Sequence, residues 1–384
     1  MTATRTDAVR LTCEAARQHA VEADRAARFP VEALAAMRRT GLLGLMVPAE
    51  YGGGGGSLTS LVDVTMELGR ADLSVALIFA MHCQQVVALV RCAGDRLRRQ
   101  VLPDAAAGRL YLASVTTEPG KGGDLLTAEA QACLLGGLLR IDREAPIVTG
   151  GRHADGFLVT MRTPGEASPS QVDLVYAARD QLRLEVIGEW RPLGMRATES
   201  VPMRLAGAVP EWQVVGEHGG FRRIVGEVFG PLAHVGWAAA WLGSAAGACS
   251  RVIGQVRGRS HPGRFDPASE LLRTRLARVR ARLDSMHALL RHTLAVLDSH
   301  PDAASPPVQL LVNALKTEAA ESCFGVVDEL MELAGLEHGY LDRSSLGLDL
   351  AFRDLRSASL NYGNDRLRLA CGSLALMDSG VRLA

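Results

Sequence analysis

The hydrophobic pattern of the chain changes twice, and this constrains its fold more than any other feature. Residues 5–110 carry apolar side chains at helical spacing, residues 113–215 carry short alternating runs separated by PG, GG and DG turns, and long helical patterns return from residue 219. The order predicts an α+β fold: an N-terminal all-α domain (1–112), a small antiparallel β-barrel or sandwich domain (113–215) and a C-terminal four-helix-bundle domain (216–384).

The clearest single helix is predicted over residues 269–299. Its apolar side chains are three or four positions apart, and arginines occupy the opposite face. The apolar stripe consists of Leu272, Leu276, Val279, Leu283, Met286, Leu290, Leu294 and Leu297. A helix with one such stripe suits a bundle.

Composition excludes several functional classes. The formal net charge of the 384 residues is zero, whereas nucleic acid and anionic membranes attract basic proteins, so neither is an expected partner. The seven cysteines are scattered without a CxxC pair, which predicts reduced thiols and no metal site. The longest apolar candidate, Val235–Ala248, is too short to span a bilayer, and no signal peptide is evident, so we expect a cytoplasmic protein. Only Lys121 and Lys316 among the 42 basic residues are lysines, which indicates a compositional bias toward arginine.

Five segments, in order, resemble the acyl-CoA dehydrogenase family. They are FPVEALAAMRRTGLLGLMVPAEYGGGG (29–55), ASVTTEPGKGGD (113–124), VTGGRHADGFLV (148–159), LGMRATES (193–200) and FRDLRSASLNYGNDRL (352–367). The resemblance extends over nearly the whole chain. It implies a flavin-dependent oxidoreductase that uses FAD, with FMN or diffusible reduced flavin as alternatives, and that assembles as a homodimer or homotetramer.

The resemblance also implies the cofactor-binding residues. An isoalloxazine ring needs N–H groups and hydroxyls along one edge, and a strand end supplies both, although threonines also favour strands for purely structural reasons. Ile147 stands where the family usually has tryptophan, and Thr149 keeps the hydroxyl expected to face N5. The residues implied are Val115, Thr116, Thr117, Gly122, Gly123, Ile147, Val148, Thr149, Arg259, Gly335 and Asn364.

The family's catalytic glutamate is missing. Alignment on the RD pair places Tyr362 at its usual position, and the alternative position falls on Pro231. A tyrosine with a pKa of about 10 is a poor base at neutral pH. The candidate catalytic residues are therefore Tyr362, His82 on a helix expected to border the substrate, and Glu227 as a relocated carboxylate. Each also has a structural interpretation: a space-filling tyrosine, a core histidine and a solvated helix residue.

Three functions stay open at this point. The first is oxidation of an unusual acyl thioester, on CoA or a carrier protein, in specialised metabolism. The second is a monooxygenase that uses reduced flavin and O₂ and needs no α-proton base. The third is a non-catalytic scaffold. The expected partners are an acyl substrate, either small or bound to a carrier protein, and a flavin reductase or electron-transfer flavoprotein.

Overall fold

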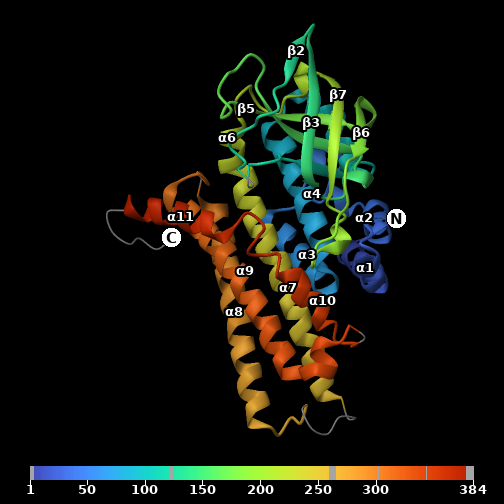
Figure 1. Cartoon of the computed structure of the whole chain (residues 1–384), viewed down its shortest axis with the longest axis vertical. Helices are drawn as coiled ribbons and strands as arrows, with labels where there is room; N and C mark the ends of the chain where they lie inside the picture. The colour runs from blue at the N-terminus through green and yellow to red at the C-terminus, as the bar shows by residue number, and fades with distance from the viewer. Residues whose placement is uncertain (1–3, 122–123, 259–264, 301, 343, 378–384) are drawn as a thin grey trace.

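The computed structural model describes residues 4–121, 124–258, 265–300, 302–342 and 344–377, and it divides into helical, strand-rich and helical parts in that order (Figure 1). Three of the predicted cofactor-binding residues, Gly122, Gly123 and Arg259, lie outside the described residues. The first helices are α1 (Arg5–Ala26), α2 (Val31–Thr40), α3 (Leu58–Ala71), α4 (Leu73–Cys92) and α5 (Asp95–Ala106).

Helix α4 is the central helix of the first domain. Asp72 caps its N-terminus, since the carboxylate accepts a hydrogen bond from the Val75 N–H at 2.8 Å. Its apolar composition and length satisfy the criteria for a membrane span, but 89% of that window is buried inside the protein. Its apolar character on all sides therefore fits a core helix surrounded by protein.

The middle strands form two sheets that pack face to face. One has the order β1-β4-β5 and the other β2-β3-β7-β6. All pairs are antiparallel except β1 and β4, which are parallel. The strands are β1 (Leu112–Val115), β2 (Cys133–Leu135), β3 (Leu138–Val148), β4 (Gly156–Arg162), β5 (Val172–Ala178), β6 (Leu182–Val186) and β7 (Val201–Pro210).

Strand β3 is irregular near its C-terminal end. Its pairing with β7 shifts register between Ala145 and Val148. Pro146 lies inside this shift and has no N–H to donate, so the ladder cannot continue regularly through it. The side chain of Ile147 is consequently turned outward and is 45% exposed.

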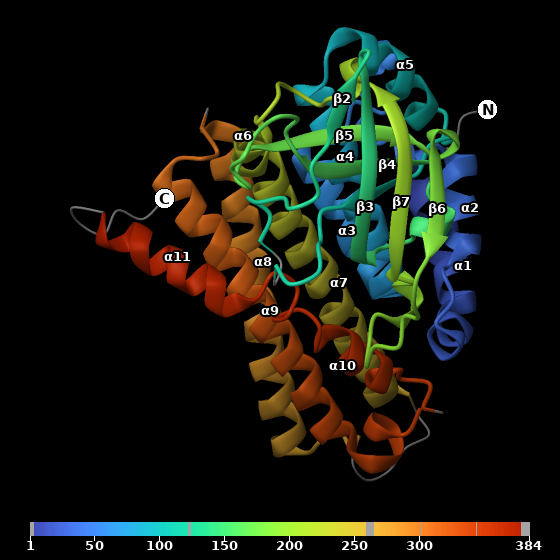
Figure 2. The same ribbon diagram turned by 45° about the horizontal axis from the view of Figure 1, so that its top comes forward.

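Long helices dominate the last part. They are α6 (Phe221–Ile224), the π-helical turn η7 (Val225–Phe229), α7 (Gly230–Arg257), α8 (Glu270–Ser299), α9 (Pro306–Gly335), the π-helical turn η8 (Leu336–Tyr340), α10 (Leu348–Leu355) and α11 (Asn364–Leu376). The predicted helix over 269–299 is α8, and its apolar stripe is buried or half-buried. Helix α11 projects away from the bundle (Figure 2). The expected α+β fold is confirmed.

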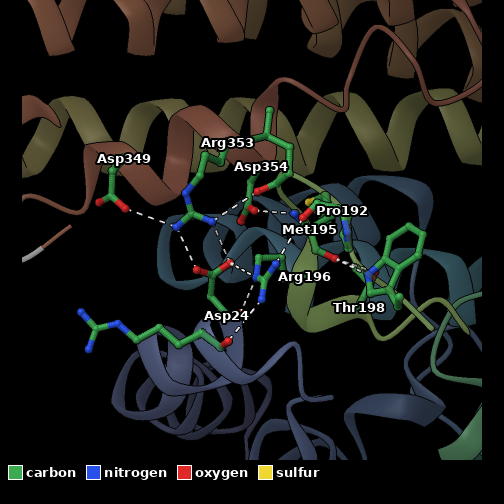
Figure 3. Close-up of polar contacts among 11 residues, drawn as sticks. Asp24, Pro192, Met195, Arg196, Thr198, Asp349, Arg353 and Asp354 are labelled. Carbon is green, nitrogen blue, oxygen red and sulfur yellow. Dashed lines mark hydrogen bonds and ion pairs between the residues drawn. The ribbon is translucent and has the colours of Figure 1, made fainter. Parts of the chain in front are cut away.

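An ion-pair network joins the three parts of the chain (Figure 3). The Arg353 guanidinium on α10 donates to both carboxylate oxygens of Asp24 on α1, at 3.0 and 2.8 Å. The Asp354 carboxylate accepts from the Met195 N–H of the middle domain at 2.6 Å. A side chain on Gly194 would collide with the Arg353 carbonyl, so only glycine permits this approach. The segment 193–200 is a docking loop with a 3₁₀ turn at Arg196–Thr198.

Candidate functional site

Two strand ends from different sheets meet at the candidate cofactor site. The Thr117 hydroxyl donates to the Ile147 carbonyl at 3.1 Å, and the Ile147 N–H donates to the same hydroxyl at 3.4 Å. Val115, two residues earlier, is fully buried and anchors the end of β1. The site thus combines half-buried threonines at 116 and 117 with the outward Ile147 side chain.

A row of hydroxyls continues from the end of β3. Thr149 Oγ1 lies 2.9 Å from Ser200 Oγ, which in turn lies 2.8 Å from Thr198 Oγ1. The Thr198 hydroxyl also donates to the Met195 carbonyl at 2.8 Å. Val148 is fully buried and offers only its backbone. The docking loop of the middle domain therefore fixes the orientation of Thr149.

A buried charge cluster lies directly beneath the strand ends. The Glu118 carboxylate accepts from the Glu129 and Ala130 N–H groups at 3.0 and 2.8 Å. It also pairs with Lys121 and with Arg143, whose side chain is fully buried. Burial lowers the pKa of Arg143 to about 10, so the guanidinium remains charged at neutral pH. Glu118 is used structurally, since its oxygens hold the loop that follows β1.

The same arginine connects this cluster to strand β1. Its Nη2 donates to Thr160 Oγ1 on β4 at 3.4 Å, and the Thr160 hydroxyl donates to the Val115 carbonyl at 3.3 Å. Arg143 thus ties together β1, β3, β4 and the loop carrying Glu118. Rigid support of this kind holds a binding surface in one geometry.

These residues fit the ring end of a flavin. The exposed apolar face at Ile147 and the hydroxyls at Thr116 and Thr117 match a flat ring with a polar edge. The adenine end is different: Gly335 ends α9 with a φ of +71°, in the helical bundle. Phe265, before the start of α8, and His338, in η8, are in ring contact at 5.4 Å, so the turn after Gly335 packs against the segment that precedes α8, remote in sequence from the strand ends.

Tyr362 lies in a turn between α10 and α11 and has a left-handed backbone with a φ of +50°. Few residues other than glycine or asparagine adopt this conformation, and such strain is often found at functional sites. Burial raises the pKa of its hydroxyl; the charge of Arg366 lowers this pKa, and the charge of Asp124, from the loop after β1, raises it. The phenol is therefore protonated at neutral pH and is not poised as a base.

Lys316 on α9 holds the Tyr362 turn in place. Its buried ammonium donates to the carbonyls of Ala358 and Tyr362 at 3.2 and 3.1 Å, and to Asn364 Oδ1 at 2.7 Å. Burial lowers its pKa to about 8. Asn364 in turn donates to Glu321 at 3.1 Å, so this predicted cofactor contact is occupied by side chains of its own domain.

Sequence reasoning missed His234, which lies on α7 beside the Tyr362 turn. The centroids of the two rings are 6.2 Å apart, and the side chain of His234 is only 6% exposed. His234 lies three residues after Pro231, the second position at which the family's catalytic glutamate was sought, so the alignment did not point to it. A histidine within an otherwise apolar helical run was the only available clue.

The other two catalytic candidates have structural partners. His82 is fully buried; its Nε2 bonds the Leu43 carbonyl at 2.9 Å, and its Nδ1 accepts from the Leu112 N–H at 3.1 Å. Burial lowers its pKa to about 4. These contacts favour the core interpretation of His82. Glu227 forms a half-exposed pair with Arg223 at 3.4 Å, which favours the solvated interpretation.

Among the described residues, no group of three or more histidine, cysteine or acidic side chains is arranged to hold a metal ion. A narrow cleft of about 140 Å³ separates α4 from α7, and it does not admit a water molecule in this conformation. It is lined by Ala80, Met81, Gln84, Leu232, Ala233 and Trp237.

Comparisons with known proteins agree with this geometry. The N-terminal domain pattern of acyl-CoA dehydrogenases matches residues 2–109, and the C-terminal domain pattern matches residues 223–378. Cyclohex-1-ene-1-carbonyl-CoA dehydrogenase of Syntrophus aciditrophicus (strain SB) is 25% identical over 94% of this chain and 86% of its own.

Two solved structures share the fold. The FMN-bound dibenzothiophene monooxygenase TdsC of Paenibacillus sp. A11-2 has a TM-score of 0.86 at 22% identity and covers 97% of each chain. The prolyl acyl carrier protein oxidase AnaB has a TM-score of 0.82 at 19% identity, with 96% of this chain and 98% of its own covered. From its two domain matches, its curated relatives and its three-part fold, the chain belongs to the acyl-CoA dehydrogenase family of flavin-dependent enzymes.

Proposed function

We propose that this chain is a flavin-dependent oxidoreductase that acts on an acyl thioester, carried by CoA or by a carrier protein, in specialised metabolism. The observation that carries the proposal is the reciprocal bonding of Thr117 and Ile147. This bonding makes one surface from two strand ends, and the charge of Asp124, in the loop after β1, acts on the Tyr362 hydroxyl.

Residues 115–117 and 147–149 would hold the flavin ring. When bound, the flavin supplies the acceptor for a hydride from the substrate. The rest of the reaction depends on the chain's own groups: the Tyr362 hydroxyl donates a hydrogen bond, Lys316 fixes its backbone, and the cluster around Glu118 keeps the strand ends together. The narrow cleft between α4 and α7 would have to widen to admit the acyl group.

The missing carboxylate limits the substrates. In the structure the second family position is Pro231, buried in the first turn of α7, and Tyr362 stays protonated. A weakly acidic α-proton therefore has no carboxylate acceptor at either position. We expect plain fatty acyl-CoA to be a poor substrate and an acyl group with a more acidic proton, or one that decarboxylates, to be preferred.

The lack of a carboxylate at positions 231 and 362 also favours one alternative, a monooxygenase that uses reduced flavin and O₂. That chemistry requires no α-proton base at position 362. The structural likeness to TdsC concerns the fold only, at 22% identity.

Assembly as a homodimer or homotetramer is part of the proposal. Helix α11 projects from the bundle and leaves Leu369, Leu376 and Met377 at 74%, 90% and 77% exposure (Figure 2). Isolated apolar side chains are common on surfaces, but a projecting helix with several of them suits a partner. A second copy would also supply the adenine-binding segment around Gly335. Light scattering measures the assembly, and a monomer at micromolar concentration contradicts it.

One experiment separates the functions. The purified, cytoplasmically expressed protein is examined for bound flavin, then mixed anaerobically with a panel of acyl-CoA and acyl-carrier-protein thioesters. Bleaching of the flavin, with reoxidation by an electron-transfer flavoprotein, supports the dehydrogenase. Substrate oxygenation that requires a flavin reductase and O₂ supports the alternative. A protein that binds no added flavin is a scaffold, and the proposal is then wrong.

A further inference from the structure

The narrow cleft between α4 and α7 has a buried inner side and an open outer side. Three of the residues that line it are buried, namely Ala80, Gln84 and Leu232. The other three are half-buried and form its open side: Met81, Ala233 and Trp237. Because the space between the two sides does not admit even a water molecule, a group that enters the cleft must first displace a side chain.

The inner side of the cleft holds the two helices together. A Cβ atom added to Gly236 of α7 would lie 3.1 Å from Ala80 Cβ of α4, so the helices are in close contact at this crossing. One turn further along α4, Gln84 Nε2 donates to the Phe229 carbonyl at 2.6 Å, where η7 ends. Close-packed contacts of this kind resist separation, so the cleft widens by rotation of side chains on its open side.

The two larger side chains on the open side are held to different degrees. The Trp237 ring contacts the rings of His234 and Trp241, at centroid distances of 5.9 and 6.2 Å. Trp241 is fully buried, so this row of rings is anchored in the core. Met81 is unbranched and flexible, and such a side chain adapts readily to a neighbour. Trp237 is therefore the fixed wall of the cleft, and Met81 is the side that moves.

The fixed wall lies close to both positions at which the family's catalytic glutamate was sought. The His234 ring, which contacts Trp237, also lies 6.2 Å from the ring of Tyr362. Leu232, on the inner side of the cleft, directly follows Pro231 in the sequence. An acyl group held in the cleft would thus lie beside these two positions.

We propose that Trp237 is a specificity-determining residue that restricts the substrate to a short acyl group. This inference rests on the proposed function, because it assigns the cleft to the acyl portion of the thioester. Rotation of Met81 frees the space of the end of its own side chain, which suits an acyl group of about four carbons or fewer. A longer chain collides with Trp237, since extra methylene groups in a filled site force side chains out of their preferred rotamers.

The test measures equilibrium binding of phosphopantetheine thioesters, because this arm is common to CoA and to carrier proteins. The flavin-loaded holoenzyme is titrated with the acetyl, butyryl and octanoyl thioesters, and none of them needs to react. The butyryl thioester should bind about tenfold more tightly than the octanoyl thioester. In Trp237→Leu, which shortens the wall, the octanoyl thioester should gain about tenfold in affinity and the preference should disappear.

A matched control is available at a second half-buried tryptophan. Trp212 lies in the 3₁₀ turn Glu211–Gln213, where its ring stacks under the guanidinium of Arg96 at 4.2 Å. Trp212→Leu should keep the wild-type preference for the butyryl thioester. Met81→Phe is an independent variant that fills the movable side with a stiffer ring, and it should weaken butyryl binding about tenfold.

Each result bears on either the inference or the proposed function. Equal binding of the butyryl and octanoyl thioesters by the wild-type holoenzyme overturns the inference, as does a flavin-loaded Trp237→Leu variant that keeps the wild-type preference. If Trp237→Leu does not take up flavin, unchanged butyryl binding in Met81→Phe overturns the inference instead. A wild-type chain that takes up no flavin, or that binds none of the thioesters, overturns the proposed function and this inference with it.

Discussion

Substitution of Arg143 by methionine should destabilise the protein and weaken flavin binding together. The guanidinium is fully buried and pairs with Glu118, whose side chain is 4% exposed. Removing one partner of such a pair leaves a buried charge and costs about 3–5 kcal/mol. Lys121, 2.5 Å from the other carboxylate oxygen, compensates in part, so we expect about 3 kcal/mol.

A double-mutant cycle isolates the interaction. Arg143→Met, Glu118→Gln and the double variant are unfolded in urea, and the coupling between the two sites should be about 2 kcal/mol. The equivalent cycle at Arg10 and Glu14, an exposed ion pair 2.8 Å apart on α1, is the control. Its coupling should be small and should disappear in high salt, because exposed pairs are screened.

Flavin affinity is the second measurement of this prediction. Arg143 also supports Thr160, whose hydroxyl bonds the Val115 carbonyl, so its loss loosens the strand end that would contact the ring. We expect the dissociation constant for FAD to rise roughly tenfold, equivalent to about 1.4 kcal/mol. A coupling below about 0.5 kcal/mol, within the range of exposed pairs, would refute the claim that this cluster supports the site.

Three further predictions concern other parts of the chain. Burial raises the pKa of Asp72 from 3.8 to about 6, so the stability that Asp72 contributes below pH 4 should be lost as the pH rises through 6, by about 3 kcal/mol at most. Asp72→Asn keeps the helix cap and should flatten the pH dependence of the free energy of unfolding measured by urea titration. An unchanged pH dependence in this variant would assign it to other groups. Arg353→Met leaves Asp24 without its principal partner and should cost about 3 kcal/mol in the same assay; a cost equal to that of Arg10→Met would show that the three-part junction contributes little. Lys316→Met leaves three buried acceptors unpaired around the Tyr362 turn. It should reduce turnover, measured by stopped-flow flavin reduction, more than flavin affinity, measured by fluorescence titration. Equal losses of turnover and affinity would indicate general unfolding.

The fold was predictable from the sequence because its signals are local. The period of the apolar side chains predicted α8 within one residue at its start, and Asp72 preceded the apolar run of α4 as a cap should. The Pro146 irregularity was not predictable as a bulge, since the same residue also fits a break between two strands.

The candidate site was only partly predictable, because its contacts join residues distant in sequence. The motifs placed residues 115–117 and 147–149 in one site, and Thr117 does bond Ile147. No local pattern indicates that Lys316 would support Tyr362, or that Asp24 would pair with Arg353. His82 was a candidate until both ring nitrogens were seen to be bonded, whereas His234 has an unpaired nitrogen that only a three-dimensional structure can reveal.

Hydrogen–deuterium exchange with and without FAD tests the central claim most directly. The account predicts that FAD slows amide exchange in residues 114–119 and 146–150, with the effect reduced in Arg143→Met. Protection confined to other segments, with these two strand ends unchanged, would contradict it.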